Sequence, residues 1–165
     1  MEIKEILVQA IKGEIEGREL YKVAAERTED RKGKEVLNYL AEEEDKHYEA
    51  LSKMYQDLSE GRKVEMPDLG KPFSFDEPKS PIFSRDFIKR IKDKHFEMSA
   101  LSIGLRLEMD AFRFYDKAAE KVDNPKLKEM FKKLSSWERG HYDMLQREID
   151  YLQTEYFSKN NFTPL

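Results

Sequence analysis

A chain of 165 residues is long enough for one ordinary domain with a real core. Its hydrophobic and charged fractions, each 39%, suit amphipathic helices, and a net charge of −4 argues against nucleic acid as a partner. The sequence has no cysteine, which excludes disulfides, cysteine-bound zinc, thiol catalysis and iron–sulfur clusters. Residues 1–8 are too charged for a signal peptide and no apolar run approaches membrane-spanning length, so we expect a cytoplasmic protein that does not contact a membrane.

The first part of the chain predicts two amphipathic helices. Apolar and small residues recur at spacings of three and four over about residues 3–27, and Glu14 interrupts the middle of that face. Gly17 follows one turn later and should make room beside a bulky group, because glycine is otherwise unfavourable within a helix. Asp30 is suited to be the N-cap of the second helix, which should end near Gly61.

Residues 61–85 form a connection of a different kind, because their prolines and glycines exclude a single helix. A connection of this length allows the second and third helices to run parallel, as in some four-helix bundles. We expect its apolar residues to pack along the bundle, with a mobile lid as the alternative; these residues are Phe73, Phe75, Ile82 and Phe83.

The second part of the chain again predicts two helices. The third helix should begin between Asp86 and Ser99 and end near Val122. Asn124 and Pro125 are suited to be the N-cap and the first residue of the fourth helix. Helix pairs at 2–60 and 86–157, followed by a short C-terminal tail, would then make up one domain covering residues 1–165.

The two helix pairs repeat each other without a gap. Glu138 lies 94 positions after Glu44, and His141 lies 94 positions after His47, so each pair ends on a Glu-x-x-His. The same offset relates Glu14 to Glu108 and Tyr21 to Tyr115. The sequence therefore contains one helix-pair unit written twice, each copy carrying a glutamate and then a Glu-x-x-His thirty residues later.

Six titratable residues interrupt the apolar faces of the four helices: Glu14, Glu44, His47, Glu108, Glu138 and His141. Surface acids on a misassigned face are the alternative, and we accept it for residues that fall off the apolar stripe, namely Glu16, Glu19, Glu42, Glu43 and Asp110. Converging buried carboxylates would repel one another, whereas two divalent cations would balance their four charges.

The spacing suits a dimetal site, because residues three apart lie on the same face of a helix. Glu44 and Glu138 can bridge two metal ions. Each histidine and each remaining glutamate can then be a terminal ligand of one ion. This mixed carboxylate–imidazole set suits iron or manganese better than copper or a closed zinc site. We therefore expect two iron ions, with manganese or a mixed pair as alternatives.

Two tyrosines and a tryptophan accompany the predicted ligands. Tyr21 and Tyr115 each follow a ligand glutamate by seven residues on the same face, so we expect their phenols to hydrogen-bond ligand carboxylates and contribute to catalysis, with core packing as the alternative. Trp137, beside Glu138, is interpreted as a packing or interface residue rather than an electron relay. His95 has no equivalent partner and is expected to be exposed.

These residues resemble the rubrerythrin-type branch of the ferritin-like superfamily. The resemblance rests on Glu14-x-x-Gly17-Arg-Glu-Leu-Tyr21 with Glu44-x-x-His47, and on Glu108 through Tyr115 with Glu138-x-x-His141. It implies an all-α, internally duplicated, ferritin-like four-helix bundle with a long crossover between helices two and three, and a non-haem di-iron site handling peroxide or dioxygen.

Two features depart from the family pattern. The cysteine-rich rubredoxin module of rubrerythrins is absent, so electrons must come from a separate donor such as a rubredoxin-like protein. An additional ligand glutamate one turn after the third-helix glutamate is replaced by Ala111.

We therefore predict a di-iron oxidoreductase of the peroxidase or ferroxidase type that reduces hydrogen peroxide or dioxygen. An iron-storage protein with ferroxidase activity is the alternative, and a di-iron oxygenase of an organic substrate is a third. The internal duplication resembles small dimeric relatives, so we expect a homodimer.

Overall fold

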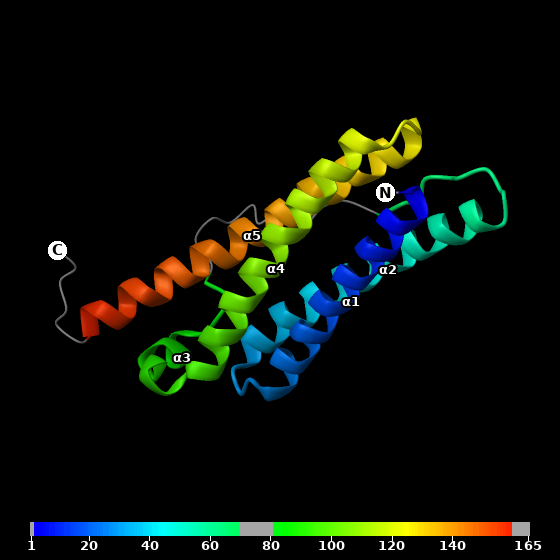
Figure 1. The fold of residues 1–165 in the computed structure, drawn as a ribbon. Helices are drawn as coiled ribbons and strands as arrows, with labels where there is room; N and C mark the ends of the chain where they lie inside the picture. The colour runs from blue at the N-terminus through cyan, green and yellow to red at the C-terminus, as the bar shows by residue number, and fades with distance from the viewer. Residues whose placement is uncertain (1, 70–80, 160–165) are drawn as a thin grey trace.

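The computed structural model describes residues 2–69 and 81–159, and within these ranges the regular structure is helical. Four long helices lie along one another in an elongated bundle (Figure 1): α1 (Ile3–Arg27), α2 (Arg31–Ser59), α4 (His95–Lys121) and α5 (Pro125–Lys159). Helix α1 packs against α2 and α4 against α5, and the two pairs meet mainly through α1 and α4. This arrangement confirms the predicted all-α bundle of two helix pairs. None of the described helices combines the length and apolarity needed to span a membrane.

The ends of the long helices follow the predicted local signals. Asp30 accepts a hydrogen bond from the backbone N–H of Gly33 at 2.8 Å and so caps α2. Asn124 does the same for α5, accepting from the N–H groups two and three residues further on at 3.0 and 3.2 Å. Gly61 has a φ of +66°, a left-handed conformation that glycine adopts without strain, and it lies just past the end of α2.

Two short elements between the helix pairs are absent from the sequence-based prediction. A five-residue helix α3 (Arg85–Lys89) and a 3₁₀ turn η1 (Ile91–Asp93) precede α4, which begins at His95. Ser84 caps α3 by accepting from the N–H of Phe87 at 3.2 Å. Elements this short do not complete enough turns to produce a recognisable apolar period.

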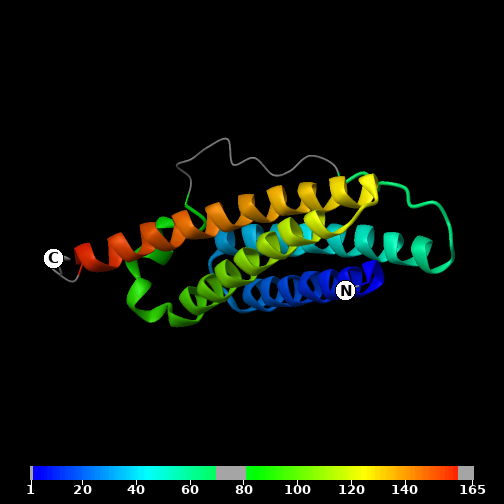
Figure 2. The ribbon, with the colours of Figure 1, turned by 45° about the horizontal axis from the view of Figure 1, so that its top comes forward.

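The crossover brings the chain from one end of the bundle to the other, so that α2 and α4 run parallel as predicted (Figure 2). Its last residues pack onto the bundle: Ile82 and Phe83 are buried and donate their backbone N–H groups to Glu148 at 2.8 and 3.3 Å. Ser84 donates its N–H and its hydroxyl to Asp30. The expected packing is confirmed for Ile82 and Phe83, whereas the same expectation for Phe73 and Phe75 falls outside the described residues.

The core consists of two apolar clusters, one toward each end of the bundle. The first includes Tyr21, Leu40, Phe83, Leu101 and Leu145. The second includes Leu7, Leu51, Tyr115, Phe131 and Leu134. Along each long helix, the predicted ligands occupy the positions between the two clusters. The polar groups therefore form one layer enclosed by apolar packing on both sides.

Gly33 provides a test of the packing between α2 and the crossover. A Cβ atom at this position would overlap the ring of Phe83, which itself stacks on Phe87 with ring centroids 3.9 Å apart. We expect Gly33→Ala to lower the free energy of unfolding by about 1–3 kcal/mol, because the ring has to move. Denaturant unfolding of the metal-free protein measures this change.

The matched control for this prediction is Gly13→Ala in α1, where an added Cβ meets no atom within 4 Å. It should stabilise the protein by up to about 1 kcal/mol through helix propensity alone. Equal effects of the two substitutions would contradict the packing argument.

Candidate metal centre

All six predicted ligands come together at the middle of the bundle. Helix α1 supplies Glu14, α4 supplies Glu108, and α2 and α5 each supply a Glu-x-x-His. Every one of these residues is at most 4% exposed. Their helical spacing accounts for the convergence, because each Glu-x-x-His projects its carboxylate and its imidazole from adjacent turns of one face.

The six side chains form two overlapping groups, in each of which the potential ligand atoms lie within 4.8 Å of one another. One group consists of Glu14, Glu44, His47 and Glu138. The other consists of Glu44, Glu108, Glu138 and His141. The carboxylates of Glu44 and Glu138 belong to both groups, which is the arrangement that two bridged ions would need.

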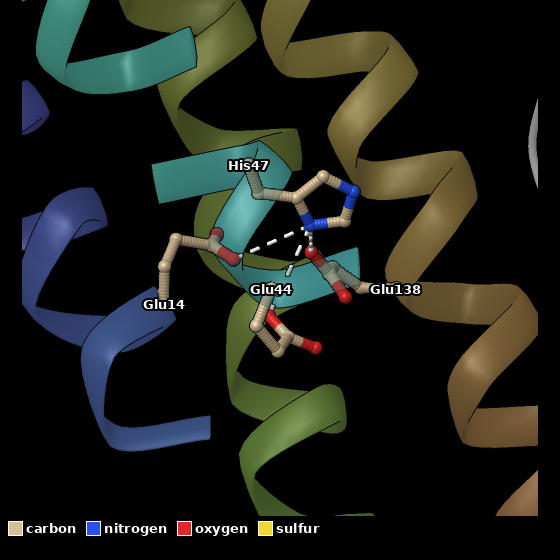
Figure 3. Close-up of side chains that lie close together, drawn as sticks. All are labelled: Glu14, Glu44, His47 and Glu138. Atoms are coloured by element: carbon tan, nitrogen blue, oxygen red, sulfur yellow. Dashed lines mark ion pairs between the residues drawn. The ribbon is translucent and has the colours of Figure 1, made fainter. Parts of the chain in front are cut away.

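In the first group the carboxylates surround one imidazole nitrogen (Figure 3). The Nδ1 atom of His47 lies 3.0 Å from Oε1 of Glu138, 3.3 Å from Oε2 of Glu14 and 3.9 Å from Oε2 of Glu44. In the second group, Nδ1 of His141 lies 3.2 Å from Glu138 and 3.4 Å from Glu44. The two imidazoles are 24° from parallel, with centroids 6.2 Å apart, so the internal duplication has become an approximate two-fold symmetry of the centre.

Several buried atoms of the centre have no hydrogen-bond partner among the described residues. They are Oε2 of Glu14, Oε1 of Glu44, both ring nitrogens of His47, Oε1 of Glu138 and Nε2 of His141. His47 Nδ1 and Glu138 Oε1 are 3.0 Å apart, yet the atoms are not aligned as donor and acceptor. Orphaned buried polar atoms are costly, and several of them lie close together here, with Nδ1 of His47 among the carboxylates of Glu14, Glu44 and Glu138. This donor set fits metal ions well.

Electrostatics show how strained the centre is without a counter-charge. Burial raises the pKa of Glu44 well above its usual range, and the neighbouring carboxylates, Glu138 foremost, raise it further. Burial likewise raises the pKa of Glu108 to about 7, although His141 opposes that shift. Burial alone would lower the pKa of His47, but Glu138 and Glu14 outweigh it and raise the pKa to about 10. Without metal, protons therefore compensate the buried charge.

The two tyrosines cross between the helix pairs. Tyr21 of α1 donates its hydroxyl to Oε1 of Glu108 on α4, and Tyr115 of α4 donates to Oε1 of Glu14 on α1. Burial, followed by the adjacent carboxylate, raises the pKa of both phenols well above the usual value, so both remain protonated donors. The expected hydrogen bonds to ligand carboxylates are present, each to the glutamate of the opposite pair. A catalytic role for the tyrosines stays a prediction.

Gly17 lies beside Glu44, one of the two carboxylates that belong to both groups. A Cβ on Gly17 would lie 3.4 Å from the carboxyl carbon of Glu44, which confirms that this glycine makes room beside a bulky group. The counterpart of Gly17 at the offset of 94 is Ala111, which is half-buried and packs against the second apolar cluster. The position that carries an additional ligand in the family pattern therefore contributes no carboxylate here.

The surface assignment of Glu43 is wrong. This carboxylate is 2% exposed and accepts hydrogen bonds from Nε1 of Trp137 at 2.8 Å and from Lys46 at 2.6 Å. Burial would raise the pKa of Glu43, but these two donors outweigh it and lower the pKa. The error arose because α5 covers a strip of α2 beside the apolar stripe. The offset of 94 contained the signal, since Glu43 and Trp137 are counterparts in the two helix pairs.

The remaining assignments to the surface are confirmed: Glu16, Glu19, Glu42, Asp110 and His95 are all exposed. Trp137 is 4% exposed and packs within the bundle, its ring against the imidazole of His47.

The fold and the centre together define a ferritin-like helical bundle with an internal set of carboxylates and imidazoles that can hold metal ions. The family model for rubrerythrin matches residues 5–149, so the chain belongs to the rubrerythrin family. The solved structure of a hypothetical protein from Pyrococcus furiosus is similar at 30% identity and a TM-score of 0.68, covering 93% of this chain and 92% of that one. No curated protein matches the chain.

The charge balance of the centre predicts how the metal-free protein responds to pH. The folded state keeps His47 protonated up to a pKa of about 10, whereas an unfolded histidine loses its proton near its model value of 6.5. Between pH 7 and 9 the folded state therefore binds more protons, so its stability falls as pH rises, by about 1.4 kcal/mol per pH unit for each extra proton. Denaturant unfolding of chelator-treated protein across this range measures the slope.

His47→Gln should reduce that slope, because it removes the group that retains its proton. His95→Gln is the matched control and should leave the slope unchanged, since His95 is exposed. Stability that stays constant or increases from pH 7 to 9 would contradict this account of the centre.

Proposed function

We propose that this protein is a di-iron oxidoreductase that reduces hydrogen peroxide or dioxygen with electrons from a separate donor protein. The observation that carries the proposal is the membership of Glu44 and Glu138 in both ligand groups, because shared carboxylates can bridge two ions. Membership of the rubrerythrin family supports the same chemistry. Iron suits the mixed carboxylate–imidazole donors, and a manganese or mixed pair would fit them as well.

The residues divide naturally between the two ions. Glu14 and His47 would be the terminal ligands of one ion, and Glu108 and His141 would be those of the other. Four carboxylates would then face two divalent cations, so the charges of the first shell cancel and the imidazoles can be neutral. Binding replaces the protons that compensate the metal-free centre, and it is therefore coupled to proton release.

The chain itself supplies orientation and exclusion of water. Tyr115 holds Oε1 of Glu14 and Tyr21 holds Oε1 of Glu108, which leaves the Oε2 atom of each carboxylate directed toward its imidazole. The two apolar clusters close the centre on both sides. When bound, the iron pair supplies Lewis-acid activation and the two electrons that peroxide reduction requires. One peroxide then takes up two electrons and two protons to give two waters.

The division into bridging and terminal ligands predicts different metal contents. Glu138→Ala removes a carboxylate shared by both groups and should abolish binding of both ions. Glu14→Ala removes a terminal ligand and should leave about one ion per chain. Metal analysis of protein loaded anaerobically with ferrous iron measures the content.

Glu16→Ala is the matched control, since Glu16 lies two residues from Glu14 on the exposed side of α1. The Glu16→Ala variant should bind as much metal as the wild type. Retention of both ions by Glu138→Ala would refute the bridging role.

Stopped-flow mixing tests the reaction itself. Hydrogen peroxide should oxidise the diferrous protein faster than it oxidises free ferrous iron, because the centre holds the two ferrous ions side by side. The expected stoichiometry is one peroxide per two irons. The Glu138→Ala variant with the same amount of iron is the control and should react as free iron does. Oxidation no faster than in that control would reject the proposal. Continued oxidation of added ferrous iron by dioxygen, with the product retained, would favour the storage alternative.

A further inference from the structure

The two helix pairs differ at another pair of counterparts beside the centre, in addition to Gly17 and Ala111. Glu43 and Trp137 are separated by 94 positions, and each precedes the glutamate of a Glu-x-x-His. They meet each other between α2 and α5, where Nε1 of Trp137 donates to Oε2 of Glu43 at 2.8 Å. One counterpart is thus an acid and the other an indole, so the surroundings of the two histidines differ.

The indole belongs to the His47 side of the centre. The ring of Trp137 meets the imidazole of His47 edge to face, with centroids 5.3 Å apart and planes at 81°. The indole ring therefore adjoins the imidazole of a predicted ligand.

Glu43 holds the indole in this orientation. Its second oxygen accepts from Nζ of Lys46 at 2.6 Å, so both oxygens of the buried carboxylate have a donor. Lys46 is 54% exposed and extends to solvent. A buried carboxylate fixed at both oxygens is a rigid acceptor, and the Trp137 ring cannot turn without losing its hydrogen bond.

Trp137 also reaches the surface of the bundle. It contributes to the lining of a hollow of about 480 Å³ together with Met66, Pro67 and Leu69 of the crossover and with Lys133. The same side chain thus extends from the hollow to the imidazole of His47. Electron tunnelling slows steeply with every ångström that must be crossed through space and not through bonded or conjugated atoms. The indole of Trp137 supplies conjugated atoms between the hollow and His47.

The sequence favours a packing role for Trp137 over an electron relay, but the contacts of its ring favour the relay. We propose that Trp137 is the electron-transfer residue of the centre and conducts electrons from a one-electron carrier protein at this surface to the metal pair through His47, with Glu43 as its positioning residue. This inference rests on the proposed function, which requires a separate donor. Each transfer oxidises one carrier and reduces one ferric ion, so two carriers restore one diferrous pair. No bond of Trp137 is formed or broken, and its Nε1 proton stays on the indole.

The test separates reduction by a protein from oxidation by a small molecule. Iron-loaded Trp137→Leu should be reduced by reduced rubredoxin about tenfold more slowly than wild type, or slower still, since the conjugated path is removed. Its oxidation by hydrogen peroxide should be unchanged, because peroxide reaches the iron pair without the indole. Phe112→Leu is the matched control: its half-buried ring packs against Tyr142 and Arg139, so neither rate should change.

Trp137→Phe provides a second variant in case the leucine form does not fold. At equal iron content the reduction rate should decrease in the order Trp, Phe, Leu, because phenylalanine preserves part of the ring. An unchanged reduction rate, or a parallel fall of both rates in the variants, would overturn the proposal and leave Trp137 a structural residue.

Fluorescence provides a readout that is independent of turnover. Trp137 is the single tryptophan of the chain, so titration of the metal-free wild type with Co²⁺ should quench its emission as the ion binds beside His47. Quenching should be lost in Glu138→Ala. Bound Co²⁺ without quenching would contradict the placement of the indole, whereas a wild type that binds no metal would refute the proposed function as well.

Discussion

The structure depends on the burial of four carboxylates and two imidazoles in one layer of the bundle. Removing such groups from water is expensive, and hydrogen bonds alone do not satisfy the layer, because several of its polar atoms have no hydrogen-bond partner among the described residues. The two tyrosines satisfy one oxygen of Glu14 and one of Glu108, and no more. The apolar clusters on either side provide the packing that offsets this cost and hold the polar atoms where a pair of cations would be bound.

Duplication allows one helix-pair sequence pattern to supply both halves of the polar layer. Each helix pair supplies three of the six groups, and the approximate two-fold symmetry places one copy opposite the other. The crossed tyrosine hydrogen bonds connect the pairs directly, since each phenol reaches the glutamate of the opposite pair. The unlike counterparts Glu43 and Trp137 make the His47 side chemically different from the His141 side.

Much of the fold and the centre could be predicted from the sequence, because the same spacing of apolar residues, glutamates and histidines occurs in both helix pairs. A lone Glu-x-x-His is weak, but the same spacing on two apolar faces, each with an earlier glutamate, has few other interpretations. The burial of Glu43 could not be predicted in the same way. Its environment depends on how far α5 covers α2, and the face of an isolated helix does not reveal that contact. The short helix α3 and the anchoring of the crossover by Glu148 and Asp30 likewise depend on tertiary hydrogen bonds.

The crossover between α2 and α4 has a consequence for the physics of assembly. Each group of potential ligands takes three residues from one helix pair and a fourth from the other, so a separate helix pair could complete the centre only by associating with a second copy of itself. Joining the copies in one polypeptide makes that encounter intramolecular, and its effective concentration is then set by the tether and not by the amount of protein in solution. The covalent link therefore makes completion of the centre independent of dilution, and it allows one half to carry a tryptophan where the other carries an acid.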